Sequence, residues 1–182
     1  MALINSKQRY GSLSIALHWL VVIAFIGVYA SIEFSDSFPK GSDMRSFLKG
    51  LHFSLGLSIF IALFVRIAAR LAGAEPEIVP AIPEKQKLAA KAIHLALYLF
   101  MLGMPVAGYI ARTLAGKVTY LFGIALPVFG SVNKELAGSI IDLHETVGNI
   151  GYFLIAAHAA AALFHHYVQK DNTLLRMLPE RK

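Results

Sequence analysis

The sequence of 182 residues contains no cysteine. Without thiols the chain cannot form disulfide bonds or hold iron–sulfur clusters, and it cannot bind haem through a thiolate or a covalent C-x-x-C-H attachment. Any metal site must use histidine, methionine, carboxylate or tyrosine ligands. The seven histidines are therefore the main resource for metal chemistry.

Charged side chains are also scarce. They make up 15% of the residues, against roughly 25% in soluble domains, while 57% of the residues are apolar. The net charge of +6 raises the question of nucleic-acid binding, but the chain has no long basic run and no basic patch interleaved with aromatic residues. The composition predicts a protein that sits in a lipid bilayer and binds no nucleic acid.

Four apolar stretches are long enough to cross a bilayer, which takes about 20 residues in a helix. They lie at about residues 12–34, 47–70, 88–111 and 139–168. Each should be a helix, because lipid offers no hydrogen-bond partner to a bare backbone. The first stretch is too long for the apolar region of a signal peptide, so we expect it to be retained. The prediction is one all-α domain over residues 1–182, built as a four-helix transmembrane bundle.

Two connecting segments have distinct compositions. Thr119–Gly130 is apolar but too short to cross, and Pro127 interrupts it. It is predicted to be an interfacial or re-entrant segment, with a simple ordered loop as the alternative. Gly73–Lys87 is a proline-rich connector. Within the third span, Pro105 should bend or locally widen the helix.

Basic residues are distributed unevenly between the two sides of the predicted bundle. With four spans, both termini and the connector share one side, which carries eleven of the 17 lysines and arginines. These eleven are Lys7, Arg9, Arg66, Arg70, Lys85, Lys87, Lys91, Lys170, Arg176, Arg181 and Lys182. The positive-inside rule places this side, and with it both termini, in the cytoplasm.

Ionisable side chains within a bilayer are costly and usually mark functional sites. His144 and His158 are 14 residues apart, nearly four helical turns, so they share one face of the fourth span about 21 Å apart along its axis. Gly148 and Gly151 lie between them on that face and leave room for flat ligands. In all, five histidines fall within the predicted spans: His18, His52, His94, His144 and His158.

Depth in the bilayer pairs His52 with His144 toward the outer side and His18 with His158 toward the inner side. His94 also lies toward the inner side and competes with His18. Haem iron is the metal that fits buried pairs of imidazoles, because zinc, copper and non-haem iron take more protein ligands at each site. A haem with two axial histidines has no open position, which favours electron transfer. Alternatively, a single membrane histidine can simply hydrogen-bond a neighbouring helix.

Several motifs resemble the bacterial cytochrome b561 family. They are SLSIALHWL around His18, LKGLHFSLGLSI around His52, LHETVGNIGYFLIAAHAAAALFHHYV in the fourth span and the tail KDNTLLRMLP. The resemblance covers nearly the whole chain. It implies a cytochrome b561-type bundle in the bacterial inner membrane that encloses two non-covalent b haems. The family pattern takes one ligand from span one, one from span two and two from span four, which are His18, His52, His144 and His158, and it demotes His94.

The likeness is strongest to compact, stand-alone members that look like superoxide oxidases. It implies an enzyme that takes electrons from periplasmic superoxide and reduces ubiquinone. One alternative is a haem-bearing membrane anchor that links a soluble redox partner to the quinone pool. Further alternatives are a shuttle to a periplasmic cytochrome c and a haem-free transporter with proton-relay histidines.

No catalytic residue is assigned from the sequence, but several side chains are candidates for supporting roles. Superoxide could be steered by basic residues of the outer side, which are otherwise ordinary loop charges: Arg45, Lys49, Arg112, Lys117 and Lys134. Protons for the quinone could come through His94, Glu33 or Asp142. Arg66 and Arg70 are positive-inside anchors or partners of haem propionates. His165 and His166 are interpreted as polar residues that end a helix at the headgroups.

Overall fold

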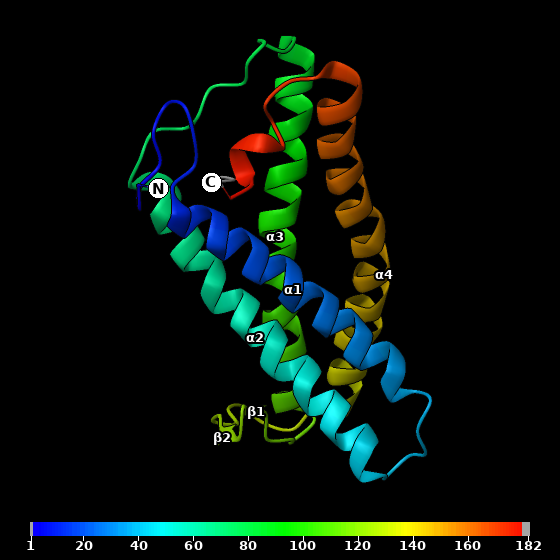
Figure 1. The fold of residues 1–182 in the computed structure, drawn as a ribbon. Coiled ribbons are helices and arrows are strands. Elements are labelled where there is room, and N and C mark those ends of the chain that lie inside the picture. Colours follow the sequence, from blue (N-terminus) through cyan, green and yellow to red (C-terminus); the bar gives the residue numbers. More distant parts are fainter. Residues whose placement is uncertain (1, 180–182) are drawn as a thin grey trace. The chain divides into compact units, whose positions relative to one another are not determined.

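A computed structural model of the protein describes residues 2–179. Arg181 and Lys182, which count toward the predicted orientation, lie outside the described residues. Four long helices make up most of the chain (Figure 1): α1 (Ser12–Ser35), α2 (Asp43–Leu71), α3 (Glu84–Leu114) and α4 (Lys134–Phe164). Each is long and apolar enough to cross a membrane. The prediction of an all-α membrane protein with four spanning helices is confirmed.

Three of the four helices, α2, α3 and α4, begin earlier than the predicted apolar stretches do. Helix α2 begins at Asp43 and α4 at Lys134, where the hydropathy predicted starts at about 47 and 139. In each case a polar cap precedes the helix: Ser42 Oγ accepts from the Arg45 backbone N–H at 3.3 Å, and Asn133 Oδ1 accepts from that of Leu136 at 3.0 Å. Such caps satisfy backbone donors of the first turn. Hydropathy detects only the apolar part of a helix, so these polar first turns were missed.

The exterior of the helices is strongly apolar. Ile26 is 65% exposed, Leu143 63% and Phe153 78%. In water, apolar surface of this extent would favour association or aggregation. In a bilayer it faces lipid tails, which agrees with four membrane-spanning helices.

The chain divides into two compact units, and each contains a part of every long helix. The terminal unit comprises Met1–Leu20, Ala62–Phe100 and Ile150–Lys182, and the hairpin unit comprises Val21–Ile61 and Met101–Asn149. Because His18, His94 and His158 belong to the first and His52 and His144 to the second, each unit holds one group of membrane histidines.

In the terminal unit, the proline-rich connector is held by both ends of the chain. The Glu77 N–H donates to the Lys7 carbonyl at 2.8 Å, and the Val79 N–H donates to Asn172 Oδ1 at 2.9 Å. The buried Arg176 guanidinium donates to the Pro76 carbonyl. The tail itself follows a π-helical turn, His165–Gln169, and contains a 3-10 turn, Leu175–Met177.

In the hairpin unit, Thr119–Gly130 forms two short antiparallel strands, β1 (Tyr120–Leu121) and β2 (Ile124–Ala125), which Figure 1 shows at the end of α3. The strands meet at Phe122 and Gly123, both with positive φ, as a tight hairpin turn requires. The ordered-loop alternative is thus closer to the structure than a re-entrant segment, although no strand was predicted. Ser54 of α2 holds this hairpin by donating to the Tyr120 carbonyl at 3.2 Å and accepting from the Phe122 N–H at 3.0 Å.

Candidate functional site

The hairpin unit brings His52 of α2 and His144 of α4 together. Their ring centres are 6.4 Å apart, with the ring planes at 70°. His52 Nδ1 lies 3.0 Å from the Val28 carbonyl, to which it donates a hydrogen bond when it carries the ring proton. This arrangement leaves Nε2 unprotonated. Metal-binding histidines commonly have their second nitrogen bonded to a carbonyl in this way.

Space beside His144 depends on a glycine of α3. A Cβ built on Gly108 would lie 3.2 Å from His144 Cε1, which is tighter than an ordinary contact. At Gly148, by contrast, a Cβ would meet Met104 Cε at 3.5 Å, an ordinary separation. His144 Nδ1 is buried without a well-formed hydrogen bond, although the Met104 carbonyl faces the ring. The ring of His144 is therefore positioned mainly by packing, and Gly108 sets its room.

The terminal unit brings three histidines together. The ring centres of His18 and His158 are 6.2 Å apart, while those of His94 and His158 are 5.5 Å apart. Trp19 packs its ring edge-on against His18 at 5.5 Å and donates from Nε1 to the Met177 carbonyl at 2.9 Å. The structure thus places His94 beside the His18–His158 pair that depth in the bilayer predicts. Only the distance between ring centres distinguishes His18 from His94 as the partner of His158.

These spacings can be compared with the geometry of axial haem ligands. Two metal–nitrogen bonds of about 2 Å, plus about 1.15 Å from each nitrogen to its ring centre, put the ring centres about 6.3 Å apart. The 6.4 Å of His52–His144 and the 6.2 Å of His18–His158 match that value. The 5.5 Å of His94–His158 is too short. By spacing alone, His52–His144 and His18–His158 are compatible with an iron between their rings, whereas His94–His158 are closer than that arrangement requires.

Two arginines of α2 lie near the histidines of the terminal unit. Arg66 Nη2 is 3.4 Å from His18 Nδ1, and the Nε and Nη1 atoms of Arg66 are buried with no hydrogen-bond partner. Arg70 donates to Glu75 Oε1 at 3.0 Å, and its side chain is 39% exposed. Their surroundings differ sharply, although the same two roles were predicted for both arginines.

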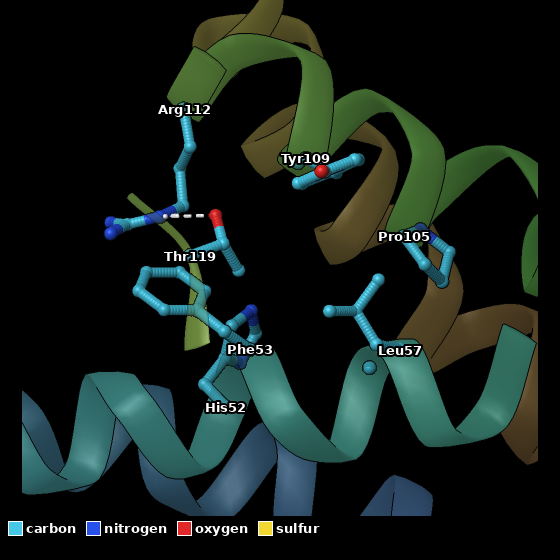
Figure 2. Close-up of a pocket in the computed structure, with 9 residues that line it drawn as sticks. His52, Phe53, Leu57, Pro105, Tyr109, Arg112 and Thr119 are labelled. Carbon is cyan, nitrogen blue, oxygen red and sulfur yellow. Dashed lines mark hydrogen bonds between the residues drawn. The ribbon is translucent and has the colours of Figure 1, made fainter. Parts of the chain in front are cut away.

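A cavity of about 40 Å³ opens beside His52 in the hairpin unit. Arg112 lies with Thr119 and Phe53 at one side of it, while Leu57 and Pro105 line it further along (Figure 2). Its other lining residues are Gly56, Gly108 and Tyr109. Arg112 Nε donates to Thr119 Oγ1 at 2.9 Å, and its guanidinium lies 4.2 Å above the centre of the Phe53 ring. Since one water needs about 10–15 Å³, the cavity can admit small molecules or ions.

Residues 9–180 match the family model described as prokaryotic cytochrome b561. The chain belongs to the prokaryotic cytochrome b561 family. Membership identifies a membrane electron-transfer protein and implies b-type haem, the cofactor whose iron the histidine pairs fit. The resemblance in the motifs around His18, His52 and the fourth span is thereby confirmed.

Curated members of the family cover almost the same length. The chain is 41% identical to cytochrome b561 homolog 1 of Escherichia coli (strain K12), over 96% of this chain and 99% of that protein. It is 35% identical to the probable superoxide oxidase CybB of Yersinia pestis, over 96% and 98%. It is 29% identical to cytochrome b562 of Cereibacter sphaeroides, over 97% and 99%. These matches place the whole chain, and not a part of it, within the b561 family.

The basic side chains considered for superoxide steering have different surroundings. Arg112 lines the cavity beside His52. Arg45 is bound in its loop, with Nη2 at 2.6 Å from Asp36 Oδ1 and Nη1 donating to the Phe38 carbonyl at 2.9 Å. Lys117 and Lys134 are exposed, and Lys49 is half-buried. Of the five, Arg112 is therefore the one positioned near a histidine pair and a cavity. Of the proposed proton donors, Glu33 and Asp142 are exposed and do not line this cavity.

His165 has a partner that sequence reasoning missed. Its Nδ1 lies 2.5 Å from Oδ2 of Asp171, a carboxyl that is 3% exposed, just after the π-helical turn. Burial raises the pKa of the Asp171 carboxyl, but hydrogen bonds from His165 and from the Thr173 N–H outweigh it and leave the pKa below its ordinary value. Both His165 and His166 lie in the turn that ends the fourth span, as predicted.

Proposed function

We propose that this protein binds two b haems, one between His52 and His144 and one between His18 and His158, and that it catalyses electron transfer from superoxide to ubiquinone. The observation that carries the proposal is the spacing of the two pairs, 6.4 and 6.2 Å between ring centres, in two separate parts of a membrane protein. Bis-histidine haem supplies one-electron transfer without an open coordination position.

The chain's own residues position the ligand rings. The Val28 carbonyl accepts the proton of His52 Nδ1 and so leaves Nε2 unprotonated and able to bind iron. On the facing helix, Gly108 leaves space for His144. In the terminal unit, the hydrogen bond from Trp19 to the C-terminal tail fixes the aromatic ring that packs against His18. Both pairs are thus held before any ligand binds, which keeps the cost of ordering them low.

The name of the Yersinia pestis relative supports superoxide as the donor. In the proposed reaction, two superoxide anions each lose one electron and become O₂, while one ubiquinone gains two electrons and two protons. Arg112 supports the same assignment, because its positive charge lies at a cavity beside His52 and attracts anions. The predicted topology, with both termini in the cytoplasm of a bacterium and the protein in its inner membrane, puts this end of α2 on the periplasmic side.

Stopped-flow mixing of the purified, oxidised protein with superoxide tests the assignment. We expect rapid haem reduction and, with ubiquinone present, quinol formation that superoxide dismutase suppresses. Haem that dithionite reduces but superoxide does not would reject the superoxide assignment. Copurification with a soluble redox subunit, together with little activity alone, would favour the membrane-anchor alternative.

A charge variant sharpens this test. Arg112→Gln should lower the second-order rate constant for superoxide by about two- to tenfold at low ionic strength, because it removes an attractive charge near the site. Lys87→Gln removes the same charge from the predicted cytoplasmic side, where Lys87 pairs with Glu84 at 2.6 Å, and should leave the rate unchanged. Equal rates for the wild type and Arg112→Gln would remove Arg112 from the mechanism.

A further inference from the structure

The guanidinium of Arg66 is largely buried within the terminal unit, and no carboxylate of the described residues pairs with it. Two of its three nitrogens, Nε and Nη1, are buried and have no hydrogen-bond partner among the residues that the structure describes. The third, Nη2, lies 3.4 Å from His18 Nδ1, and the Tyr98 hydroxyl is a further, uncharged hydrogen-bond partner of the guanidinium. An unpaired charge in a low-dielectric interior is strongly unfavourable unless a ligand compensates it.

The ionisable groups that act on Arg66 do not include a carboxylate. They are Tyr98 and Tyr10, which are phenols, and Arg70, which is a second cation. Arg70, one turn further along α2, has what Arg66 lacks, because it pairs with Glu75 and is partly exposed. Arg70 therefore fits the role of a positive-inside anchor. Arg66 lacks an anionic partner among the residues that the structure describes.

The contact with His18 also points to a missing acceptor. Arginine is only a donor, so the Nη2 contact requires an unprotonated His18 Nδ1. A neutral His18 that binds iron through Nε2 carries its proton on Nδ1 instead. In that state the guanidinium and the ring present donors to each other, so the Arg66 donors that face the ring need another partner. Carboxylates and phosphates suit such a planar, forked set of donors.

We propose that Arg66 binds a propionate carboxylate of the haem held between His18 and His158. The inference rests on the proposed ligation by this pair and assigns Arg66 as a positioning residue for that haem. Arg66 is the cation within contact of His18, and haem b brings two carboxylates to the same place. Neutralising a propionate beside iron favours the reduced state, so Arg66 raises the reduction potential of this haem and leaves that of the His52–His144 haem unchanged.

The test is a redox titration of purified Arg66→Gln protein, with the haem:protein ratio measured on the same sample. We expect the ratio to fall from two toward one, or the midpoint potential of one haem to fall while the other stays at its wild-type value. Arg70→Gln is the matched control on the same helix and should retain both haems and both potentials. The second haem reports in each variant whether the protein has folded.

Arg66→Lys resolves the case in which Arg66→Gln loses both haems. Lysine keeps the positive charge but not the forked set of donors, so we expect this variant to bind two haems. The midpoint potential of the affected haem should lie between the wild-type and Arg66→Gln values. If only the lysine variant folds, that potential should lie below the wild-type value. Two haems with wild-type potentials in Arg66→Gln, or in Arg66→Lys when the glutamine variant does not fold, would overturn the proposal. This outcome would leave the superoxide reaction of the wild-type protein unaffected, so the two proposals fail separately.

A lipid phosphate could offer the same chemistry as a propionate, and esterified haem distinguishes them. Protein produced without haem is reconstituted in detergent with haem b or with its dimethyl ester, which lacks both carboxylates. We expect Arg66→Gln to weaken binding of haem b at one site while leaving binding of the ester as in the wild type. An equal effect of the substitution on haem and ester would assign Arg66 to a lipid phosphate and contradict the propionate assignment.

Discussion

The ring-centre distances from His158 to its two candidate partners, His18 and His94, differ by less than one ångström. His18 lies at 6.2 Å from it and His94 at 5.5 Å, against about 6.3 Å expected for two axial ligands. Depth along the helices could not make this distinction, because both side chains lie toward the same end of their spans. Their ligation of iron stays a prediction, and substitution of each histidine tests it.

His144→Ala should remove one haem and His18→Ala the other, because each leaves iron with a single protein ligand. His94→Ala should retain both haems. The measurement is the haem:protein ratio together with the reduced-minus-oxidised spectrum of each purified variant. If His94→Ala loses a haem while His18→Ala retains both, the assignment of the first helix is wrong.

Asp171 provides a second test at the scale of one residue. Because its folded-state pKa is lowered, its ionised form stabilises the protein fully above the unfolded value of about 3.9, and this stabilisation is lost as the pH falls through the folded value. At neutral pH, Asp171→Asn should lower the free energy of unfolding by about 1.5–3 kcal/mol, the range for hydrogen bonds to charged groups.

Unfolding of the detergent-solubilised protein at several pH values measures this effect. Glu77→Gln, which neutralises an exposed carboxylate of the connector, should unfold like the wild type. An Asp171→Asn protein as stable as the wild type at neutral pH would show that the His165–Asp171 contact contributes nothing.

At the scale of elements, the helices were predictable and the hairpin was not. Lipid forces an apolar stretch into a helix, so hydropathy alone located α1 to α4, and the polar first turns of α2, α3 and α4 escaped it. The strands Tyr120–Leu121 and Ile124–Ala125 are two residues each, too short for any periodicity. Their position depends on Ser54, 66 residues from Tyr120 along the chain, which no local pattern reveals.

Helix α3 offers a matched pair of glycines. Gly108→Ala places a methyl group 3.2 Å from His144 Cε1, so we expect the ring to shift by a few tenths of an ångström and the haem at this pair to be lost or spectrally altered. Gly103→Ala meets nothing within 4 Å and should retain the wild-type spectrum. In a helix the change from glycine to alanine by itself is favourable by about 1 kcal/mol.

Haem content and the wavelength of the reduced α band report the outcome for both variants. A Gly108→Ala protein with the wild-type spectrum would mean that the neighbouring backbone yields easily and that Gly108 does not control the ring.

At the scale of the whole molecule, the sequence was informative about which residues meet and less so about what surrounds them. The pairing of His52 with His144 follows from depth, because position along a spanning helix translates into height in the bilayer, whereas depth left both His18 and His94 as partners for His158. The contrast between Arg66 and Arg70 could not be predicted, since they share a helix and a charge and differ only in their neighbours. For the same reason, the contact between Asp171 and His165 was not predicted.

Orientation in the membrane is a prediction from charge alone, with eleven of the 17 basic residues on the side of the termini. A green fluorescent protein fused to the C-terminus should fluoresce, and alkaline phosphatase fused there should be inactive. Phosphatase inserted in the loop between α1 and α2 should be active. The reverse pattern would place the His52–His144 pair at the cytoplasmic end and remove it from periplasmic superoxide.

The central claim is that two pairs of imidazoles each bind one haem iron. Its most direct measurement is the haem:protein ratio of the wild-type protein, purified from cells supplied with a haem precursor and accompanied by a reduced-minus-oxidised spectrum. We expect two b haems per chain, both low-spin and both reducible by dithionite. A ratio of one or zero in correctly folded protein would contradict it.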